Sequence, residues 1–328
     1  MKFFPHHQCS SSEKQVLSAD DIKKLLQQAE LCLISIPSIG NVGQLAMDYL
    51  IAGLSSNHSN QSAKYSRMEK LGYLETGFLL PLVGNDPYHH PHHSSIGKVH
   101  SALEVYSLQF QSENNELIGP NIIFIHCRSI IIYPTLFVRD LNEWIAKGNS
   151  DDPEYFLKNL QSLVVLSSAN AAFRDDRLIQ GLQTESEFGM TSIACNLAIV
   201  DENQFPLNEY LANVPRLDAE KYPMFLSGVN KKLLENEETL SENGESSGVV
   251  RKLNRAIVFM ICSEGENSMH GIFLSKVITA ELLLPYHNRN KGNVATSLSN
   301  VNSIDWKLPY SWRHFFGAPS DDTHNLYN

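Results

Sequence analysis

The sequence predicts an α/β protein with a mostly parallel or mixed central sheet and helices on both of its faces. Two observations favour this fold class. Short runs in which nearly every residue is apolar are typical of strands buried on both faces, because neither side of such a strand meets water. These runs alternate with amphipathic stretches along the 328 residues, which is the pattern of a three-layer α/β/α sandwich.

The first unit is a strand, a glycine turn and a helix. Leu31–Ile36 is the strand, Pro37–Gly40 is the turn, and apolar residues recur at helical spacing from Asn41 to Leu54. Later apolar runs predict strands at residues 103–110, 122–132, 163–166 and 256–261. Amphipathic stretches predict helices at residues 20–30, before the first strand, and at residues 134–147, 153–160 and 269–284 after it.

Three segments interrupt this alternation and are expected to be mobile loops. Ser55–Ser66 is rich in Ser and Asn, His89–Ser95 in His and Ser, and Glu235–Gly248 in Glu, and none has apolar periodicity. There is no internal repeat, and no long polar linker separates two complete patterns. The sequence therefore predicts one domain, at residues 1–317, followed by a flexible tail at residues 318–328.

Composition argues against several classes of partner. The chain has 26 Lys and Arg against 36 Asp and Glu, a net charge of −10, whereas nucleic-acid affinity depends on clustered basic residues. Its apolar runs fall far short of the roughly 20 residues that span a bilayer, and its start does not resemble a secretory signal. We expect no nucleic-acid or membrane partner, and a location in the cytoplasm and nucleus. The five cysteines lack metal or redox spacing and are predicted to be free thiols, most of them buried.

Three motifs were weighed as catalytic or ligand sites. Gly40–Gly43 resembles a phosphate-binding turn but lacks a third glycine and a P-loop lysine, so a close helix–strand contact is favoured. His89–His93 has no carboxylate or cysteine beside it to complete a metal site. Ser167 and Ser168 follow the predicted strand at 163–166 without the G-x-S-x-G turn of a nucleophile. We predict no catalytic residue, cofactor or metal, and hence no enzyme.

The chain ends in Leu326, Tyr327 and Asn328, preceded by a polar run. One interpretation is a frayed terminus. The other is a docking tail, in which Leu326 fills an apolar slot, the Tyr327 ring packs with its hydroxyl bonded, and the terminal carboxylate meets a lysine. Such a short anchor binds weakly unless a larger folded interface raises its effective concentration.

Seven sequence blocks resemble the PAC2 family of proteasome assembly chaperones. They occur in the family's order and include two long, specific motifs at either end of the chain. The blocks are Ser38–Asp48, Gly72–Tyr73, Leu80–Tyr88, Glu104–Leu108, Val164–Ser168, Ser263–Asn267 and Trp306–Gly317.

The resemblance implies a non-enzymatic chaperone with a fold related to nucleoside phosphorylase-like folds. It implies pairing with proteasome assembly chaperone 1, binding to the α-ring of the proteasome core particle, promotion of ring formation and prevention of off-pathway ring dimers. Members of the pair can carry a hydrophobic-Tyr-any residue tail that inserts between α-subunits, a pattern that Leu326, Tyr327 and Asn328 fit. Against the family, loops at about 55–66, 88–100 and 201–249 are insertions.

Some residues of this chain match the family's motifs, and the resemblance leaves open whether they support the fold or contact a partner. These are Gly40, Asn41, Val42, Gly43, Gln44, Asp48, Gly84, Asn85, Pro87, Tyr88, Trp306, Pro309, Trp312 and Arg313. Two alternatives stay open beside the chaperone: a phosphorylase- or hydrolase-like enzyme, since a fold does not fix function, and a binding module of another complex.

Overall fold

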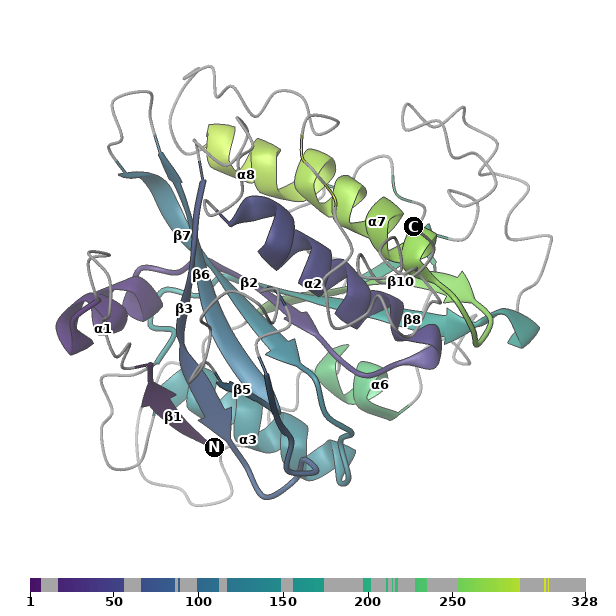
Figure 1. Ribbon diagram of the computed structural model, residues 1–328, viewed down its shortest axis with the longest axis horizontal. Helices are drawn as coiled ribbons and strands as arrows, with labels where there is room; N and C mark the ends of the chain where they lie inside the picture. Colours follow the sequence, from purple (N-terminus) through teal and green to yellow (C-terminus); the bar gives the residue numbers. More distant parts are fainter. Residues whose placement is uncertain are drawn as a thin grey trace, which may run out of the picture.

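Within the part of the chain that the structure describes, eight strands form one mixed sheet at the centre of the molecule, in the order β1-β3-β6-β7-β2-β8-β10-β9 (Figure 1). The strands are β1 (Lys2–Pro5), β2 (Leu31–Ser35), β3 (Ser66–Glu75), β6 (Leu103–Gln111), β7 (Leu117–Cys127), β8 (Ser162–Asn170), β9 (Leu197–Asp201) and β10 (Asn254–Cys262). β4 (Val83–Asn85) and β5 (Val99–Ser101) form a separate antiparallel pair. This computed structural model describes residues 1–6, 17–55, 66–85, 88, 99–111, 117–148, 156–173, 197–201, 211, 214, 216–217, 228–234, 253–289, 304 and 306.

The sheet has a parallel centre and antiparallel wings. β7, β2, β8 and β10 run parallel, whereas β6, β3 and β1 on one side and β9 on the other run antiparallel to their neighbours. The predicted α/β class with a mixed sheet is therefore confirmed.

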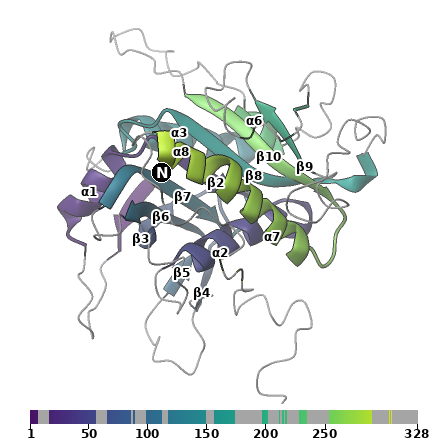
Figure 2. The ribbon, with the colours of Figure 1, turned by 90° about the horizontal axis from the view of Figure 1, so that it is seen from above.

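Helices cover both faces of the sheet, as two views at right angles show (Figures 1 and 2). One face packs against α1 (Ala19–Gln27), α3 (Pro134–Lys147) and α6 (Gly228–Leu234). The other packs against α2 (Val42–Leu54) and a helical run of α7 (Ser268–Val277), a π-helical turn (Ile278–Leu283) and α8 (Leu284–Arg289). Within β2, Cys32 and Ile34 belong to the first core and Leu31 and Leu33 to the second, as a strand buried on both faces requires.

Two glycines allow strand β8 and helix α7 to pack closely against α2. A Cβ atom on Gly43 would stand 2.3 Å from the carbonyl oxygen of Leu166 in β8, and one on Gly271 in α7 would stand 2.8 Å from the Leu45 Cβ. Larger side chains would force the backbones apart. The close helix–strand contact predicted for the Gly40–Gly43 turn is therefore present.

Several predicted boundaries are wrong. The strand expected at residues 122–132 is β7 and ends at Cys127, because the chain beyond it leaves the sheet. Residues 156–160, expected to end a helix, form turns in which Leu157 and Leu160 are buried. Ser167 and Ser168 lie inside β8 rather than after it.

Other elements lie where no strand or helix was predicted. β1 and β3 form a wing, β5 overlaps the end of the predicted 88–100 insertion, and β9 and α6 lie within or beside the predicted 201–249 insertion. Cys32, Cys127 and Cys262 are buried free thiols as predicted, while Cys9 and Cys195 lie outside the described residues.

Candidate functional site

A row of polar side chains crosses the sheet on the face covered by α2. Ser35 in β2 pairs in register with His126 in β7, and His126 pairs with Glu104 in β6. Their neighbours Leu33 and Phe124 belong to the core under α2, so the two-residue period of a strand turns these polar side chains toward the same helix. All three are fully buried.

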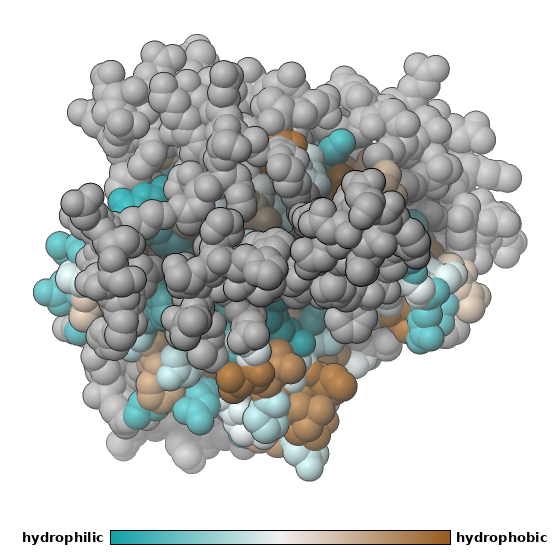
Figure 3. Space-filling model, viewed as in Figure 1, coloured by the Kyte–Doolittle hydropathy of each residue, from teal (hydrophilic) through white to brown (hydrophobic). Residues whose placement is uncertain are grey.

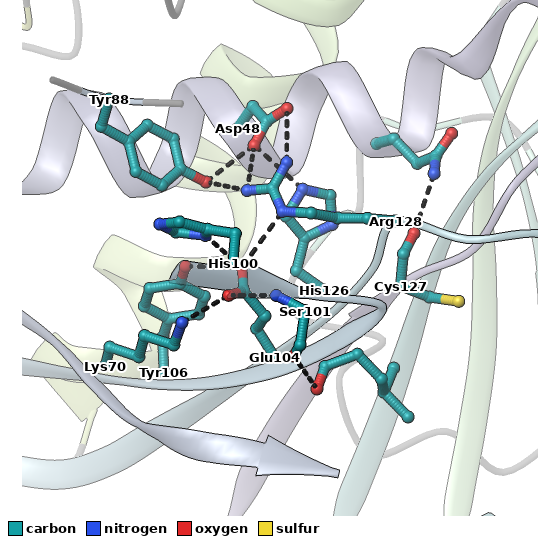
Figure 4. Close-up of polar contacts among 12 residues, drawn as sticks. Asp48, Lys70, Tyr88, His100, Ser101, Glu104, Tyr106, His126, Cys127 and Arg128 are labelled. Atoms are coloured by element: carbon teal, nitrogen blue, oxygen red, sulfur yellow. Dashed lines mark hydrogen bonds and ion pairs between the residues drawn. The ribbon is translucent and has the colours of Figure 1, made fainter. Parts of the chain in front are cut away.

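Two residues one turn apart on α2 reach down to the end of β7. The Gln44 side chain donates to the carbonyl oxygen of Cys127 at 2.8 Å, and Asp48 lies over His126 and Arg128. Positions i and i+4 lie on one face of a helix, which explains why both contact the same strand end. The side chains that meet there form the ion cluster, made of Asp48, Lys70, Tyr88, His100, Glu104, Tyr106, His126 and Arg128 (Figure 4).

Asp48 is completely buried and accepts hydrogen bonds from Tyr88, His126 and Arg128. Tyr88 Oη donates at 2.7 Å, His126 Nε2 at 2.9 Å and an Arg128 terminal nitrogen at 2.8 Å, all to Oδ1. The second terminal nitrogen of Arg128 reaches Oδ2 at 3.4 Å. Such bonds to an ionised acceptor are stronger than neutral ones, and they offset part of the cost of burying the charge.

Glu104 is the second buried carboxylate and accepts from five groups. His100 Nδ1 lies at 2.7 Å, Tyr106 Oη at 2.9 Å and Arg128 Nε at 3.1 Å from Oε2. Oε1 accepts from the Lys70 ammonium and from the Ser101 backbone N–H. Lys70 and Tyr106 are register partners on β3 and β6, so the sheet itself places two of these donors.

Arg128 joins the two carboxylates, as Figure 4 shows. Its Nε donates to Glu104 and its terminal nitrogens donate to Asp48, while the guanidinium carbon lies 5.6 Å from the centre of the Tyr88 ring. One guanidinium and one ammonium balance two carboxylates, so with neutral histidines the ion cluster carries no net charge.

The surroundings keep both carboxylates ionised. Burial alone would raise the pKa of Asp48, but the Arg128 charge and the bonds from Arg128 and His126 outweigh it, so its pKa is far below the ordinary range. The same opposition acts on Glu104, where burial is outweighed by the His100 bond and the Arg128 and Lys70 charges, and its pKa is also strongly lowered.

His126 is held neutral. Burial and the neighbouring Arg128 charge lower its pKa from 6.5, and Asp48 only partly opposes them. In the neutral ring Nε2 carries the proton donated to Asp48, which leaves Nδ1 to accept from the Ser35 hydroxyl at 2.7 Å. One tautomer thus satisfies both contacts.

The ion cluster is arranged to hold the fold rather than to exchange protons. Its carboxylates are saturated with donors, and burial raises the pKa of Tyr88 and Tyr106 well above their ordinary value. Burial also raises the pKa of the adjacent Cys127 thiol to about 12, which removes thiolate character at neutral pH. Among the described residues, no group of three or more His, Cys, Asp or Glu side chains could hold a metal ion.

The predicted motif residues fall into three sets. Asp48 and Tyr88 belong to the ion cluster, and Gln44 contacts the Cys127 backbone beside it. Gly40 and Asn41 have φ of +62° and +53° in the tight turn before α2, Val42 is buried in the core, and Trp306 packs near Gly53 on α2. Gly84 and Asn85 lie on β4, away from this turn in sequence, and Gly84 is exposed.

The remaining predicted residues lie outside the described part of the chain. They are Pro87, Pro309, Trp312, Arg313 and the tail residues Leu326, Tyr327 and Asn328, together with the His89–His93 patch.

Sequence reasoning did not name six members of the ion cluster as candidate residues, namely Lys70, His100, Glu104, Tyr106, His126 and Arg128. Of these, Glu104 and Tyr106 stood only inside the family block Glu104–Leu108. A signal was present, because Glu104 and His126 are polar residues inside strongly apolar strand sequences. Burying a polar or charged side chain is costly without a partner, so each implied an unseen hydrogen-bonding or charged partner. The partners lie 24 to 80 residues away from Arg128, a separation that no local spacing reveals.

Comparison with known proteins identifies the family. The model of the PAC2 family matches residues 32–265, which is more than half of the chain and includes every member of the ion cluster. The chain belongs to the PAC2 family. The expected family membership is thereby confirmed.

Relatives of this PAC2 family chain carry one name. Proteasome assembly chaperone 2 from Xenopus laevis is 25% identical over 291 residues, covering 87% of this chain and 91% of the relative. The protein of the same name from Homo sapiens is 25% identical over 297 residues, with the same coverage. A solved structure of the archaeal proteasome activator PbaB from Pyrococcus furiosus covers 90% of this chain and 87% of its own, with 11% identity and a TM-score of 0.37. No helix within the described residues of this chain has the length and apolar character needed to cross a membrane.

Proposed function

We propose that the chain is an assembly chaperone of the 20S proteasome core particle. In this proposal it pairs with proteasome assembly chaperone 1, binds the α-ring, promotes ring formation and prevents off-pathway ring dimerisation in the cytoplasm and nucleus. The observation that carries the proposal is the similarity to proteins named proteasome assembly chaperone 2 along about nine tenths of their length. The PAC2 family match also supports it.

The proposed mode of action is binding, without catalysis. The ion cluster supports this, because its two carboxylates are ionised and saturated with donors and its tyrosines have strongly raised pKa values. A general acid or base needs a pKa near the working pH. We infer that this cluster contributes a rigid frame for binding surfaces.

The first experiment is affinity purification of the tagged full-length chain from its native cytosol, with mass spectrometry and native gels. The expected result is a second small chaperone together with α-subunits and without mature β-subunits. Recovery of the chain alone, as judged by its size on a native gel and by mass spectrometry, would contradict the proposal.

The C-terminal tail is proposed as a second anchor on the α-ring. Leu326 and the Tyr327 ring would contribute about 2–4 kcal/mol of burial, and the Asn328 carboxylate would add a charge-assisted bond to an α-subunit lysine. The tail must act beside the folded interface, because association alone costs at least about 4 kcal/mol.

We predict that Tyr327→Ala weakens α-ring binding roughly tenfold and leaves pairing with chaperone 1 unchanged. Surface plasmon resonance against isolated α-rings measures the loss, and Met269→Ala, at an exposed apolar residue on α7, is the matched control for folding. Equal α-ring affinity of the Tyr327 variant and the native chain would remove the tail from the proposal.

A further inference from the structure

The chain leaving β7 pairs with the chain leading to β4 and forms an exposed apolar surface. The Leu80 N–H donates to the Ile130 carbonyl at 3.1 Å, and the Ile132 N–H donates to the Phe78 carbonyl at 2.9 Å. Leu79 is buried and Ile131 packs against the core, so the alternate residues face outward. We call this surface the apolar ledge; its residues, between 42% and 76% exposed, are Leu80, Leu82, Val83, Ile130, Ile132 and Tyr133.

The apolar ledge is about as large as the largest apolar patch of a typical monomeric protein, and such a patch is often functional. With about 150–200 Å² for each fully exposed large side chain, its exposed apolar area is roughly 500 Å². Figure 3 shows apolar side chains gathered at the lower edge of this face of the molecule. A standard interface buries about 800 Å² on each partner, so the apolar ledge has the size of the apolar centre of one interface.

The two segments that build the apolar ledge carry no charge. Residues 77–84 and 129–135 contain no Asp, Glu, Lys, Arg or His. The buried centres of protein–protein interfaces are depleted of charged residues in this way. Nucleic acids and anionic membranes are instead bound through Lys and Arg, which these segments lack.

The net charge of the chain favours a different protein, rather than a second copy of this chain, as the partner that binds the apolar ledge. Each molecule carries a formal charge of −10, so two copies repel one another as they approach. A partner with a less acidic surface meets no such barrier.

The ion cluster holds the apolar ledge in place. Arg128, two residues before Ile130, is fixed by Asp48 and Glu104, and its backbone N–H donates to the Ala102 carbonyl at 2.8 Å. The Ser129 hydroxyl donates to the Leu80 carbonyl at 2.6 Å and ties the two segments together. A surface ordered before binding loses less conformational entropy when its partner arrives.

From this geometry we propose that the apolar ledge is the docking surface for a second, different folded protein chain with an apolar counter-surface. The inference rests on the proposed function, which supplies that second chain as the partner chaperone subunit. It adds the location and the apolar character of the contact.

The test measures binding of the full-length chain to full-length proteasome assembly chaperone 1 by isothermal titration calorimetry. The test variant is Val83→Ser with Ile130→Ser, whose native side chains are 76% and 63% exposed. Met269→Ser, at an exposed apolar residue on α7, is the matched control. We expect the double variant to bind at least tenfold more weakly, with the control and the native chain equal and all three melting at similar temperatures.

Each other outcome has a defined meaning. If the native chain does not bind chaperone 1, the proposed function fails. If the native chain binds and the double variant binds equally well, the docking surface lies elsewhere and the inference fails. Sedimentation velocity of the chain alone completes the test: a dimer that the double substitution dissolves would make a second copy the occupant. Binding lost only on removal of residues 318–328 would assign the contact to the tail. Either result overturns the inference.

Discussion

The ion cluster and the apolar ledge are neighbours that invert the usual distribution of residue types. Glu104 is charged and fully buried and the Arg128 side chain is only 12% exposed, whereas Ile130 and Val83 are apolar and exposed, and a single residue, Ser129, separates Arg128 from Ile130. Charged residues are rarely buried unless they are paired, and contiguous apolar surface is rarely left in water. Polar contacts inside the fold therefore fix the end of β7, while the apolar residues that follow β7 stay exposed and available for contacts with another protein.

The largest test of this contrast is Arg128→Gln. Removing the guanidinium leaves Asp48 and Glu104 buried without their shared counter-charge, so we expect a loss of about 3–5 kcal/mol in the free energy of unfolding. Urea unfolding followed by circular dichroism measures it. Arg139→Gln, at an exposed arginine on α3, is the control and should change stability by less than about 0.5 kcal/mol. Equal losses in the two variants would mean that the ion cluster does not hold the fold.

Acid should weaken the ion cluster in two stages. The folded pKa of His126 lies below its unfolded value of 6.5, so the unfolded chain binds the extra proton and stability falls as pH drops below about 6.5. The pKa values of Asp48 and Glu104 are also lowered by folding, and their contribution is lost as pH falls through about 4 toward the folded values. Both stages destabilise the fold in acid.

The histidine stage can be separated by His126→Gln. This variant should lose less stability than the native chain between pH 7 and pH 5, because one proton contributes a slope of at most about 1.4 kcal/mol per pH unit. The carboxylate stage should remain. Chemical unfolding at a series of pH values measures both slopes, and parallel curves for the two proteins across that range would rule out His126 as the titrating group.

The smallest expected effect on stability belongs to the apolar ledge. Val83→Ser alone should change the free energy of unfolding by less than about 0.5 kcal/mol, because the native side chain is 76% exposed. Thermal unfolding of the isolated chain checks this. A loss approaching that of Arg128→Gln would show that Val83 supports the fold and would erase the contrast between the two regions.

The sequence predicted the centre of the sheet better than its edges. β2, β8 and β10 are apolar at consecutive positions because both faces are covered, and such runs are visible in any sequence. β3 was missed because Arg67, Glu69 and Lys70 interrupt its apolar pattern on a wing of the sheet. Residues 129–132 were expected to extend a strand for the opposite reason, since apolar periodicity does not distinguish a residue facing the core from one facing a partner.

The candidate site could be predicted only in part. Asp48 and Tyr88 were named through the family resemblance, and the structure joins them by a hydrogen bond of 2.7 Å across 40 residues of sequence. Arg128 was not named, because its role is to pair with two carboxylates, and these lie on α2 and β6, far from it in the sequence. Long-range charge pairing becomes visible only when the strand register is known.

The order of strands in the sheet also determines when each strand can pair with its neighbours during synthesis. β2 lies between β7 and β8, and its pairing with β8 joins Leu31–Ser35 to residues beginning at Ser162. At roughly 5–20 residues per second, a ribosome needs on the order of 10 s to make the intervening chain. Until then the β2 backbone groups that will face β8 have no sheet partner, whereas β3, β6 and β7 are made within that interval and can pair as antiparallel neighbours before β8 exists. A nascent chain of this protein thus completes its antiparallel wing well before it can complete its parallel centre.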